Sequence, residues 1–398
     1  MLSQFGGDWL SNLIWLLFFI LMVIFYPRLM ISQILWRLDQ VVANLSNLTN
    51  SAKKLVLKKV SKGTKNLKKA KMALDNFLEF FVIEPVSLDP FGIIKKFEHL
   101  INLSLHRFKY FAKRIAPGLD EEERANLMMG ISGTITLYQL MKTVRHYVIF
   151  IRKTRNIQLA LLLQMQIPLI EKISKAFYRG TEAFINGWPV GDGIGALVAA
   201  SLIENPYKVE EIEEDTLAFY TKIEGKDVII VKAKGPGGRL GKLGRAVEKI
   251  VKKNRISKII TIDAALRLEG EKPGSVAEGV GVAIGGIGID KAFVEEIATK
   301  LNIPIDSIVI KVSQEEAIMP MKVEILNSLD RVRELVLENI RESDKRGKIL
   351  IVGVGNTCGI GNSKKEAEEA AKKIRRTYLM LKEKGYFEEI KPKGFLWF

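Results

Sequence analysis

The chain has 398 residues, of which 47% are hydrophobic and 27% are charged. This apolar content supports a folded core and excludes a disordered or collagen-like protein, and at roughly 150 residues per domain the length predicts two or three units. Lysine and arginine number 61 against 45 acidic residues, so the formal charge of +16 favours an anionic partner such as phospholipid or nucleic acid. The single cysteine, Cys358, excludes an intramolecular disulfide and a cysteine-rich zinc site.

Residues 9–27 form an uncharged, largely apolar run, close to the roughly 20 residues that cross the hydrocarbon core of a bilayer. We predict one transmembrane helix in the cell membrane. A cleaved signal peptide is the alternative, but no basic segment precedes the run and no small-residue cleavage site follows it. The lysine-rich segment Lys53–Lys71 contains no acid, so the positive-inside rule places the C-terminal domain of this single-pass protein in the cytoplasm.

The segment Lys53–Lys71 has three interpretations: contact with anionic headgroups, a solvated helix face, or contact with a nucleic acid. Its place after a membrane span favours the headgroups, where each cation contributes about 1 kcal/mol. No aromatic residue interleaves with the lysines for base stacking, so no specific nucleic-acid binding is expected.

The middle of the chain is expected to be helical, because apolar residues recur at three- and four-residue spacing. The expected helices cover 31–48, 51–82, 91–115, 119–153 and 156–185. The apolar stretch 159–165 is flanked too closely by charges for a second membrane span, so we expect a buried bundle or an interface in a homo-oligomer. No chemistry is assigned to this region.

After Trp188 glycines concentrate, and short β-branched runs alternate with charged helices, which is typical of an α/β layer fold. We predict a hairpin and three further strands, at 216–223 with 227–233, 258–262, 307–312 and 348–354. The predicted division is a membrane anchor at 1–30, a helical region with the polybasic segment at 31–186, and an α/β domain at 187–398.

Two aspartates in the α/β domain are candidate functional residues. Asp263 follows an uncharged stretch at the expected carboxyl end of a strand, which is where ligands of open α/β sheets bind. Asp192 lies in a glycine-rich loop before an apolar helix, either as the N-cap of that helix or as a presented carboxylate. The alternative to a functional role is that Asp192 is only a helix cap and Asp263 only a turn residue.

Two glycine-rich loops are candidate anion or nucleotide sites. In the loop 234–242, backbone amides before a basic helix could cradle an anion, but the Gly-Lys-Ser/Thr ending of a Walker loop is missing. The loop 353–362 departs from the spacing of a dinucleotide fingerprint. The candidate binding residues are Gly235, Gly237, Gly238, Lys242, Gly353, Gly355 and Asn356. The sequence names no cofactor, and no metal ligands are assigned.

Over nearly its whole length the chain resembles an archaeal family of membrane-anchored proteins, the domain of unknown function fifteen-twelve. Besides the apolar N-terminal run, the resemblance is carried by the motifs Glu84–Pro90, Gly191–Gly195, Glu316–Met321 and Gly353–Thr357. Membership of this family implies no activity.

A second resemblance concerns only residues 187–288. The segment Gly191–Ala199 is similar to the Asp-Gly-Ile-Gly-Pro segment of hydrogenase-maturation endopeptidases, with Ala196 in place of the proline. The segments Ile262–Arg267 and Pro273–Ser275 look like the Asp-Ala-Leu and Pro-Gly-Ser segments of spore germination endopeptidases.

This second resemblance implies a three-layer α/β fold of the phosphorylase/hydrolase type, with Asp192 and Asp263 as the two key acids. No histidine follows His146, so the histidine that serves hydrogenase-type members as a nickel contact is missing. In those enzymes a glycine-rich strand end similar to Gly353–Asn356 precedes the Asp-Gly-Ile-Gly loop, whereas in this chain it closes the domain. We therefore expect a circularly permuted sheet.

The sequence leaves two classes of function open. In the first, the chain is a membrane-anchored, cytoplasm-facing peptidase in which one aspartate activates water while the other protonates the departing amine. In the second, it is a noncatalytic membrane-tethered scaffold that oligomerises through its helices and binds an anionic ligand, a nucleotide or nothing at its glycine loops.

Overall fold

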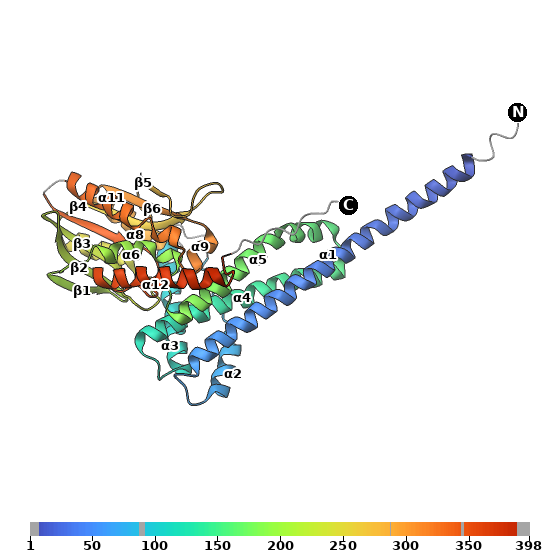
Figure 1. The fold of residues 1–398 in the computed structure, drawn as a ribbon, viewed down its shortest axis with the longest axis horizontal. Coiled ribbons are helices and arrows are strands. Elements are labelled where there is room, and N and C mark those ends of the chain that lie inside the picture. Colours follow the sequence, from blue (N-terminus) through green and yellow to red (C-terminus); the bar gives the residue numbers. More distant parts are fainter. Residues whose placement is uncertain (1–7, 87–91, 287, 344–345, 388–398) are drawn as a thin grey trace.

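The computed structural model describes residues 8–86, 92–286, 288–343 and 346–387. A layered α/β body lies at one end, and an arm of long helices extends from it (Figure 1). Most of the family motif Glu84–Pro90 lies outside the described residues. The first part of helix α1 (Asp8–Val60) projects beyond every other helix, with its apolar side chains exposed (Figure 1). Among the described helices, α1 is the one long and apolar enough to cross a membrane.

The predicted break between residues 48 and 51 is wrong, because α1 continues unbroken to Val60. The predicted single helix over 51–82 is also wrong, because a turn after Val60 separates α1 from α2 (Leu67–Phe77). Polar residues at 46–51 suggested a boundary, but Leu45 and Val56 are buried on the inner side of α1 and this packing overrides local propensity. The turn occurs at Gly63, where the Cβ of any other residue would lie only 2.8 Å from Cγ of Leu119.

The remaining helices of the arm agree with the predicted ranges. They are α3 (Ile93–Ile115), α4 (Glu121–Thr154) and α5 (Ile157–Asn186), the last with Pro168 inside it. Side-chain caps fix the starts of α4 and α5, since Asp120 accepts from the amide of Glu123 and Asn156 accepts from that of Leu159. Helices α4 and α5 form an antiparallel hairpin against α1, and the ion pairs Lys59–Glu123 and Arg152–Asp39 link α1 to the two ends of α4.

The body contains a seven-stranded mixed sheet of order β1-β2-β3-β7-β4-β6-β5. The pairs β3–β7, β7–β4 and β4–β6 are parallel, and the other pairs are antiparallel. The strands are β1 (Lys208–Glu213), β2 (Thr216–Ile223), β3 (Lys226–Ala233), β4 (Ile256–Leu266), β5 (Val276–Val280), β6 (Ile305–Val312) and β7 (Lys348–Gly353).

The predicted hairpin is confirmed, and its two-residue turn has positive φ at Glu224 and Gly225, as hairpin turns of this length require. The edge strands β1 and β5 were not predicted, because neither shows the alternation of apolar and polar residues that marks a half-buried strand. Strand β4 is longer than predicted, since its pairing with β6 continues to Leu266.

Helices cover both faces of the sheet. Helices α6 (Ile194–Ser201), α11 (Leu329–Glu342) and α12 (Lys364–Glu383) share one apolar core with the sheet, whereas α7 (Leu243–Lys253) and α8 (Ile289–Leu301) share another. The short helices α9 (Gln314–Ile318) and α10 (Val323–Leu326) follow β6. Strand β3 leads into α7 and the neighbouring β7 leads into α12, so adjacent parallel strands lead to opposite faces at their carboxyl ends.

Strand β7, which closes the domain in sequence, lies in the centre of the sheet rather than at its edge. This position is the one that a circularly permuted sheet requires, and the permutation itself stays a prediction. Helix α5 ends at Asn186 and Gly187 adopts the left-handed conformation after it, so the arm passes directly into the segment that carries Asp192.

Candidate active site

Glycines bring Asp192 close to the carboxyl ends of the central strands. Asp192 is the middle residue of a single 3-10 turn, η1 (Gly191–Gly193), which leads into α6. A Cβ at Gly195 would collide with the carbonyl oxygens of Ile262 in β4 and Val354 after β7. A Cβ at Gly355, where φ is +120°, would collide with the carbonyl oxygen of Asp192. The turn therefore lies directly against β4 and β7.

Asp263 is 4% exposed and is held by two backbone amides. Its Oδ1 accepts from the amide of Ala264 at 2.7 Å, and its Oδ2 accepts from the amide of Gly285 at 2.7 Å. Burial, the largest cause, and the charge of Asp192 together raise the pKa of Asp263 to about 8, against the opposing effect of the two amides. Asp263 is therefore largely protonated at neutral pH.

Asp192 is half-buried, and its Oδ2 accepts from the amide of Asn356 at 2.9 Å. Burial raises the pKa of Asp192, and the Asn356 amide opposes that rise. The residue before α6 is Gly193, which makes no side-chain cap, so Asp192 does not cap this helix. Asp263 likewise is not a turn residue, because β4 continues for three residues beyond it.

The two carboxyl groups interact electrostatically, since the charge of Asp192 contributes to the raised pKa of Asp263. Two interacting carboxyls cannot both ionise easily, and they then hold different proton states at one pH. Such a pair can combine a proton acceptor with a proton donor, which is the requirement for general acid–base catalysis.

The glycine-rich loop 234–242 contacts the helical arm through the amides that were predicted to cradle an anion. The amide of Gly238 donates to Oδ1 of Asn126 at 2.7 Å, and that of Gly237 donates to the carboxylate of Glu122, both residues of α4. The amide of Gly235 donates to Oδ1 of Asn362 at 2.9 Å. These three amides hold protein acceptors, so an anion would have to displace them.

Lys242, the fourth candidate of this loop, pairs with Glu214 at 3.0 Å. Arg239 anchors the same loop: its guanidinium is 4% exposed and pairs with Glu121 at 3.0 Å and with Asp215 at 3.1 Å. The loop is therefore the attachment of the α/β body to the start of α4.

The candidate residues of the second loop pack against the acidic turn. A Cβ at Gly353 would collide with Cβ of Ala199, and Gly355 meets Asp192 as described above. Asn356 is 3% exposed, and its Oδ1 accepts from the amide of Cys358 while its own amide donates to Asp192. These contacts shape the acid pair, and each of them is a protein contact rather than an exposed nucleotide cradle.

Lys232 is a buried cation at the same edge that the sequence analysis did not single out. Its Nζ donates to the carbonyls of Ala233 and Gly361 and to Oδ1 of Asn362, at 2.8, 3.0 and 2.9 Å. Burial lowers the pKa of Lys232 to about 7, and the Glu366 charge opposes this. The available signal was a lysine at the end of an otherwise apolar strand.

The remaining groups that could take part in chemistry are the cysteine thiol and any cluster of potential metal ligands. Cys358 is fully buried, and burial raises the pKa of its thiol to about 12, which keeps it protonated. Within residues 8–86, 92–286, 288–343 and 346–387, no group of three histidine, cysteine or acidic side chains is arranged to hold a metal ion.

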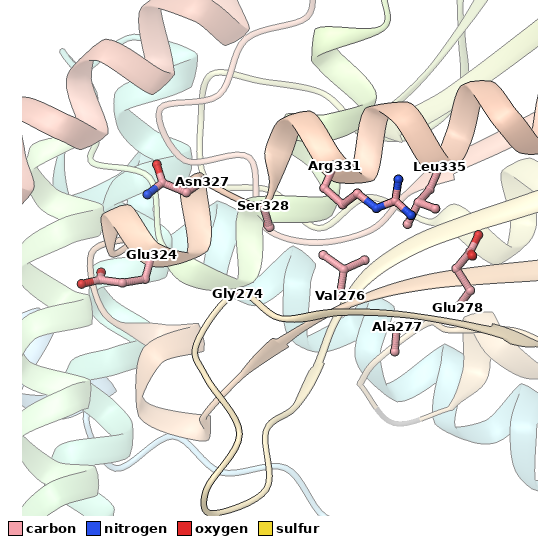
Figure 2. Close-up of a pocket in the computed structure, with 9 residues that line it drawn as sticks. All are labelled: Gly274, Val276, Ala277, Glu278, Glu324, Asn327, Ser328, Arg331 and Leu335. Atoms are coloured by element: carbon pink, nitrogen blue, oxygen red, sulfur yellow. The ribbon is translucent and has the colours of Figure 1, made fainter.

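Two cavities lie away from the aspartates. One of about 500 Å³ lies between β5 and helices α10 and α11 (Figure 2). The other, of about 220 Å³, lies where Lys109 and Arg124 of the arm face Asp215 and Arg239 of the body. The acid pair is therefore not part of either cavity.

Comparison with protein families gives two matches that together cover most of the chain. Residues 12–187 match a model described as protein of unknown function (DUF1512) N-terminal domain, and residues 190–361 match domain of unknown function (DUF1512) C-terminal. No curated protein and no solved structure matches the chain.

The raised pKa of Asp263 predicts how stability depends on pH. The folded chain binds a proton at this residue over a range, from about pH 4 to about pH 8, in which the unfolded chain releases it. The contribution of this bound proton to stability is fully present below the pKa of Asp263 in the unfolded chain. It is lost as pH rises through the pKa of Asp263 in the folded chain. Each pKa unit is worth about 1.4 kcal/mol, so the loss is on the order of a few kcal/mol.

Asp263→Asn should therefore flatten the fall in unfolding free energy between about pH 5 and about pH 7, well inside that range. Urea denaturation in detergent measures this slope. Asp227→Asn, at an exposed ion pair with Lys222, is the matched control and should keep the wild-type slope. Equal slopes in the wild type and in Asp263→Asn would show that the Asp263 carboxyl has no raised pKa.

Proposed function

The chain belongs to the DUF1512 family, to which no activity is assigned, and we propose that it is a membrane-anchored hydrolase whose Asp192 and Asp263 cleave peptide bonds. The single observation that carries this proposal is the acid pair beside the carboxyl end of β7, where Asp263 lies within β4 and is protonated at neutral pH by burial and by its neighbour.

The contacts of the two carboxyls suggest different roles. The raised pKa leaves Asp263 protonated at neutral pH, so this residue can offer its proton to the departing amine. Asp192 is the more exposed of the two, and a single backbone amide binds its Oδ2. Asp192 is therefore the better base for activating a water molecule, and proton transfer between the pair would restore the starting state.

Solvent can approach the pair from the segment that follows β5. Gly285, whose amide holds Asp263, and the next residue Gly286 are both exposed. Leu266 and Leu268, which follow Asp263 in the chain, are also exposed and offer apolar contacts to a substrate side chain. A polypeptide would approach the acids from this side, and cleavage requires that the carboxyl of Asp263, 4% exposed in the structure, becomes accessible to it.

The test uses the full-length chain in detergent with fluorescein-labelled casein as the probe. We expect cleavage by the wild type, and a loss of at least about 100-fold in Asp192→Asn and Asp263→Asn, the usual contribution of a general acid or base. Asp290→Asn is the matched control, because burial raises the pKa of Asp290 and the Gly244 amide binds it at the start of α8, in a position outside the pair.

Intact casein with the wild type, or equal cleavage by Asp263→Asn, would contradict hydrolysis at this pair and leave the noncatalytic scaffold. One observation favours that second candidate. Leu162, Met165 and Leu169 form an exposed, uncharged stripe on α5, of the kind that helices bury between copies of an oligomer. In that case the arm, rather than the acid pair, carries the function.

The proposed anchor is the projecting part of α1. Its side chains from Leu13 to Tyr26 are exposed apolar groups, and a bilayer would remove them from water. Basic residues follow the uncharged run, beginning with Arg28 and Arg37, which supports a cytoplasmic position for the body.

The geometry favours different headgroup contacts from those expected at Lys53–Lys71. Lys53 lies about 40 Å along the same helix from Pro27, several Debye lengths away if α1 stands upright in the bilayer. Lys53 also pairs with Asp75, and Lys59 pairs with Glu123. We therefore assign the headgroup contact to the hairpin end that joins α4 to α5.

The hairpin end is closer to the proposed membrane. Ile151 lies in the same apolar cluster as Ile31, and Ile157 packs against that cluster, just after the uncharged run of α1. Arg152, Lys153 and Arg155 give this end a positive charge, and the exposed Phe150 lies beside them.

Single labels can measure these depths in vesicles that mix phosphatidylcholine and phosphatidylglycerol, since the native Cys358 is buried. We expect a fluorophore at Leu17→Cys to be quenched by lipids labelled deep in the acyl chains, and one at Phe150→Cys by lipids labelled at the headgroup. A label at Lys58→Cys, the control, should be quenched only by aqueous iodide.

Iodide quenching of the Leu17→Cys label to the same extent as the Lys58→Cys label would contradict the anchor. Headgroup quenching at Lys58→Cys but not at Phe150→Cys would contradict the assigned orientation of the arm and would restore the lysine-rich segment as the headgroup contact.

A further inference from the structure

The two edges of the sheet differ in how they are protected against added strands. Edge strands expose unpaired backbone groups, and proteins commonly protect them with charges, bulges or short length. Strand β1 carries Lys208 and three glutamates among its six residues, and its register shifts between Glu211 and Glu213. Strand β5, at the opposite edge, has the sequence Val-Ala-Glu-Gly-Val, with one charge and no register shift. Both strands are short, with five residues in β5 and six in β1, but β5 lacks the row of charges and the register shift, so the β5 edge is the more open one.

The register shows which backbone groups of β5 are available. The amide of Lys311 donates to the carbonyl of Ser275, and the amide of Gly281 donates to the carbonyl of Ile305. In an antiparallel pair the bonding alternates, so the odd-numbered residues of β5 face β6. The N–H and C=O groups of Val276, Glu278 and Val280 point away from β6, towards the open edge.

A cavity of about 500 Å³ accompanies this edge, between β5 and helices α10 and α11 (Figure 2). Val276 and Glu278 project to the helix side, whereas Ala277 projects to the other side (Figure 2). Leu335 of α11 lines the cavity opposite Val276. An added strand would direct every second side chain into this space, and a groove between an edge strand and a helix is one that binds extended peptides.

The charges of the groove favour a basic side chain. Glu278 and Glu324 line the cavity against one cation, Arg331, which pairs with Glu334 at 2.8 Å outside it. A second copy of this chain fits less well, because pairing two β5 strands would place like charges of Glu278 near each other.

We propose that the β5 edge and its groove bind an extended segment of another protein, which adds a strand to the sheet and places a lysine or arginine against Glu278. The groove is separate from the acid pair. Glu278 accepts from Nδ2 of Asn339 on the side of the sheet that α11 covers. Ile262 belongs to the apolar core on that same side, so the next residue of β4, Asp263, projects to the opposite side of the sheet. The segment is therefore a docked partner and not the chain cleaved at the acid pair.

The probes are three fluorescein-labelled hexapeptides of alternating threonine and valine, with lysine, glutamate or proline at one central position. Fluorescence anisotropy with the full-length chain in detergent should show binding of the lysine peptide. We expect the glutamate peptide to bind at least about tenfold more weakly and the proline peptide, which cannot form the strand, not to bind.

Variants at the exposed end of β5 separate strand addition from other binding. Val280→Pro removes an outward amide without touching the β5–β6 ladder, and should weaken the lysine peptide at least about tenfold. Val280→Thr keeps that amide and should bind like the wild type, since Val280 is 93% exposed. Glu278→Lys should reverse the preference, so that the glutamate peptide binds more tightly.

Three results would overturn the proposal. The first is no binding of the lysine peptide up to about 1 mM, the weak end of measurable affinity. The second is unchanged binding to Val280→Pro. The third is an oligomer of this chain that dissociates in Val280→Pro during sedimentation, which would assign the edge to a second copy.

Discussion

The close backbone contact between the turn before α6 and the loop after β7 is the constraint on which the candidate site depends. A Cβ at Gly355 would collide with the carbonyl of Asp192, and one at Gly193 would meet the carbonyl of Asn356 at 2.6 Å. Because only glycine fits these positions, the Asn356 amide can reach Asp192, and Asp192 comes close enough for its charge to act on Asp263. The proton states of both acids follow from that approach.

The same edge of the sheet also joins the body to the arm. The loop after β3 gives its amides to Glu122 and Asn126 of α4, and the buried guanidinium of Arg239 pairs with Glu121. Separating the arm from the body would leave the buried guanidinium of Arg239 without its acidic partners, which is costly. The arm and the acid pair therefore both depend on this edge of the sheet.

Local sequence signals predicted what local interactions determine. The turn at Glu224 and Gly225 and the caps at Asp120 and Asn156 act within a few residues, and the elements around them agree with the predictions. The continuous helix α1 depends on packing against α4, and the polar residues near Thr49 gave no sign of it. The edge strand β5 depends on β6, which lies beyond α8 in the chain, and β1 pairs with the adjacent β2 although its residues do not alternate, so hydrophobic periodicity reveals neither strand.

The acid pair could be predicted only in part from the sequence. Asp192 and Asp263 could be selected from their loops, but their interaction depends on crossover connections and on the central position of β7. The most direct test is a carbon-13 NMR titration of the Asp263 carboxyl in the full-length chain and in Asp192→Asn. We expect the pKa of Asp263 to lie near 8 in the wild type and to fall when the Asp192 charge is removed. A pKa in the ordinary range of a carboxyl, or one that Asp192→Asn leaves unchanged, would contradict an interacting pair.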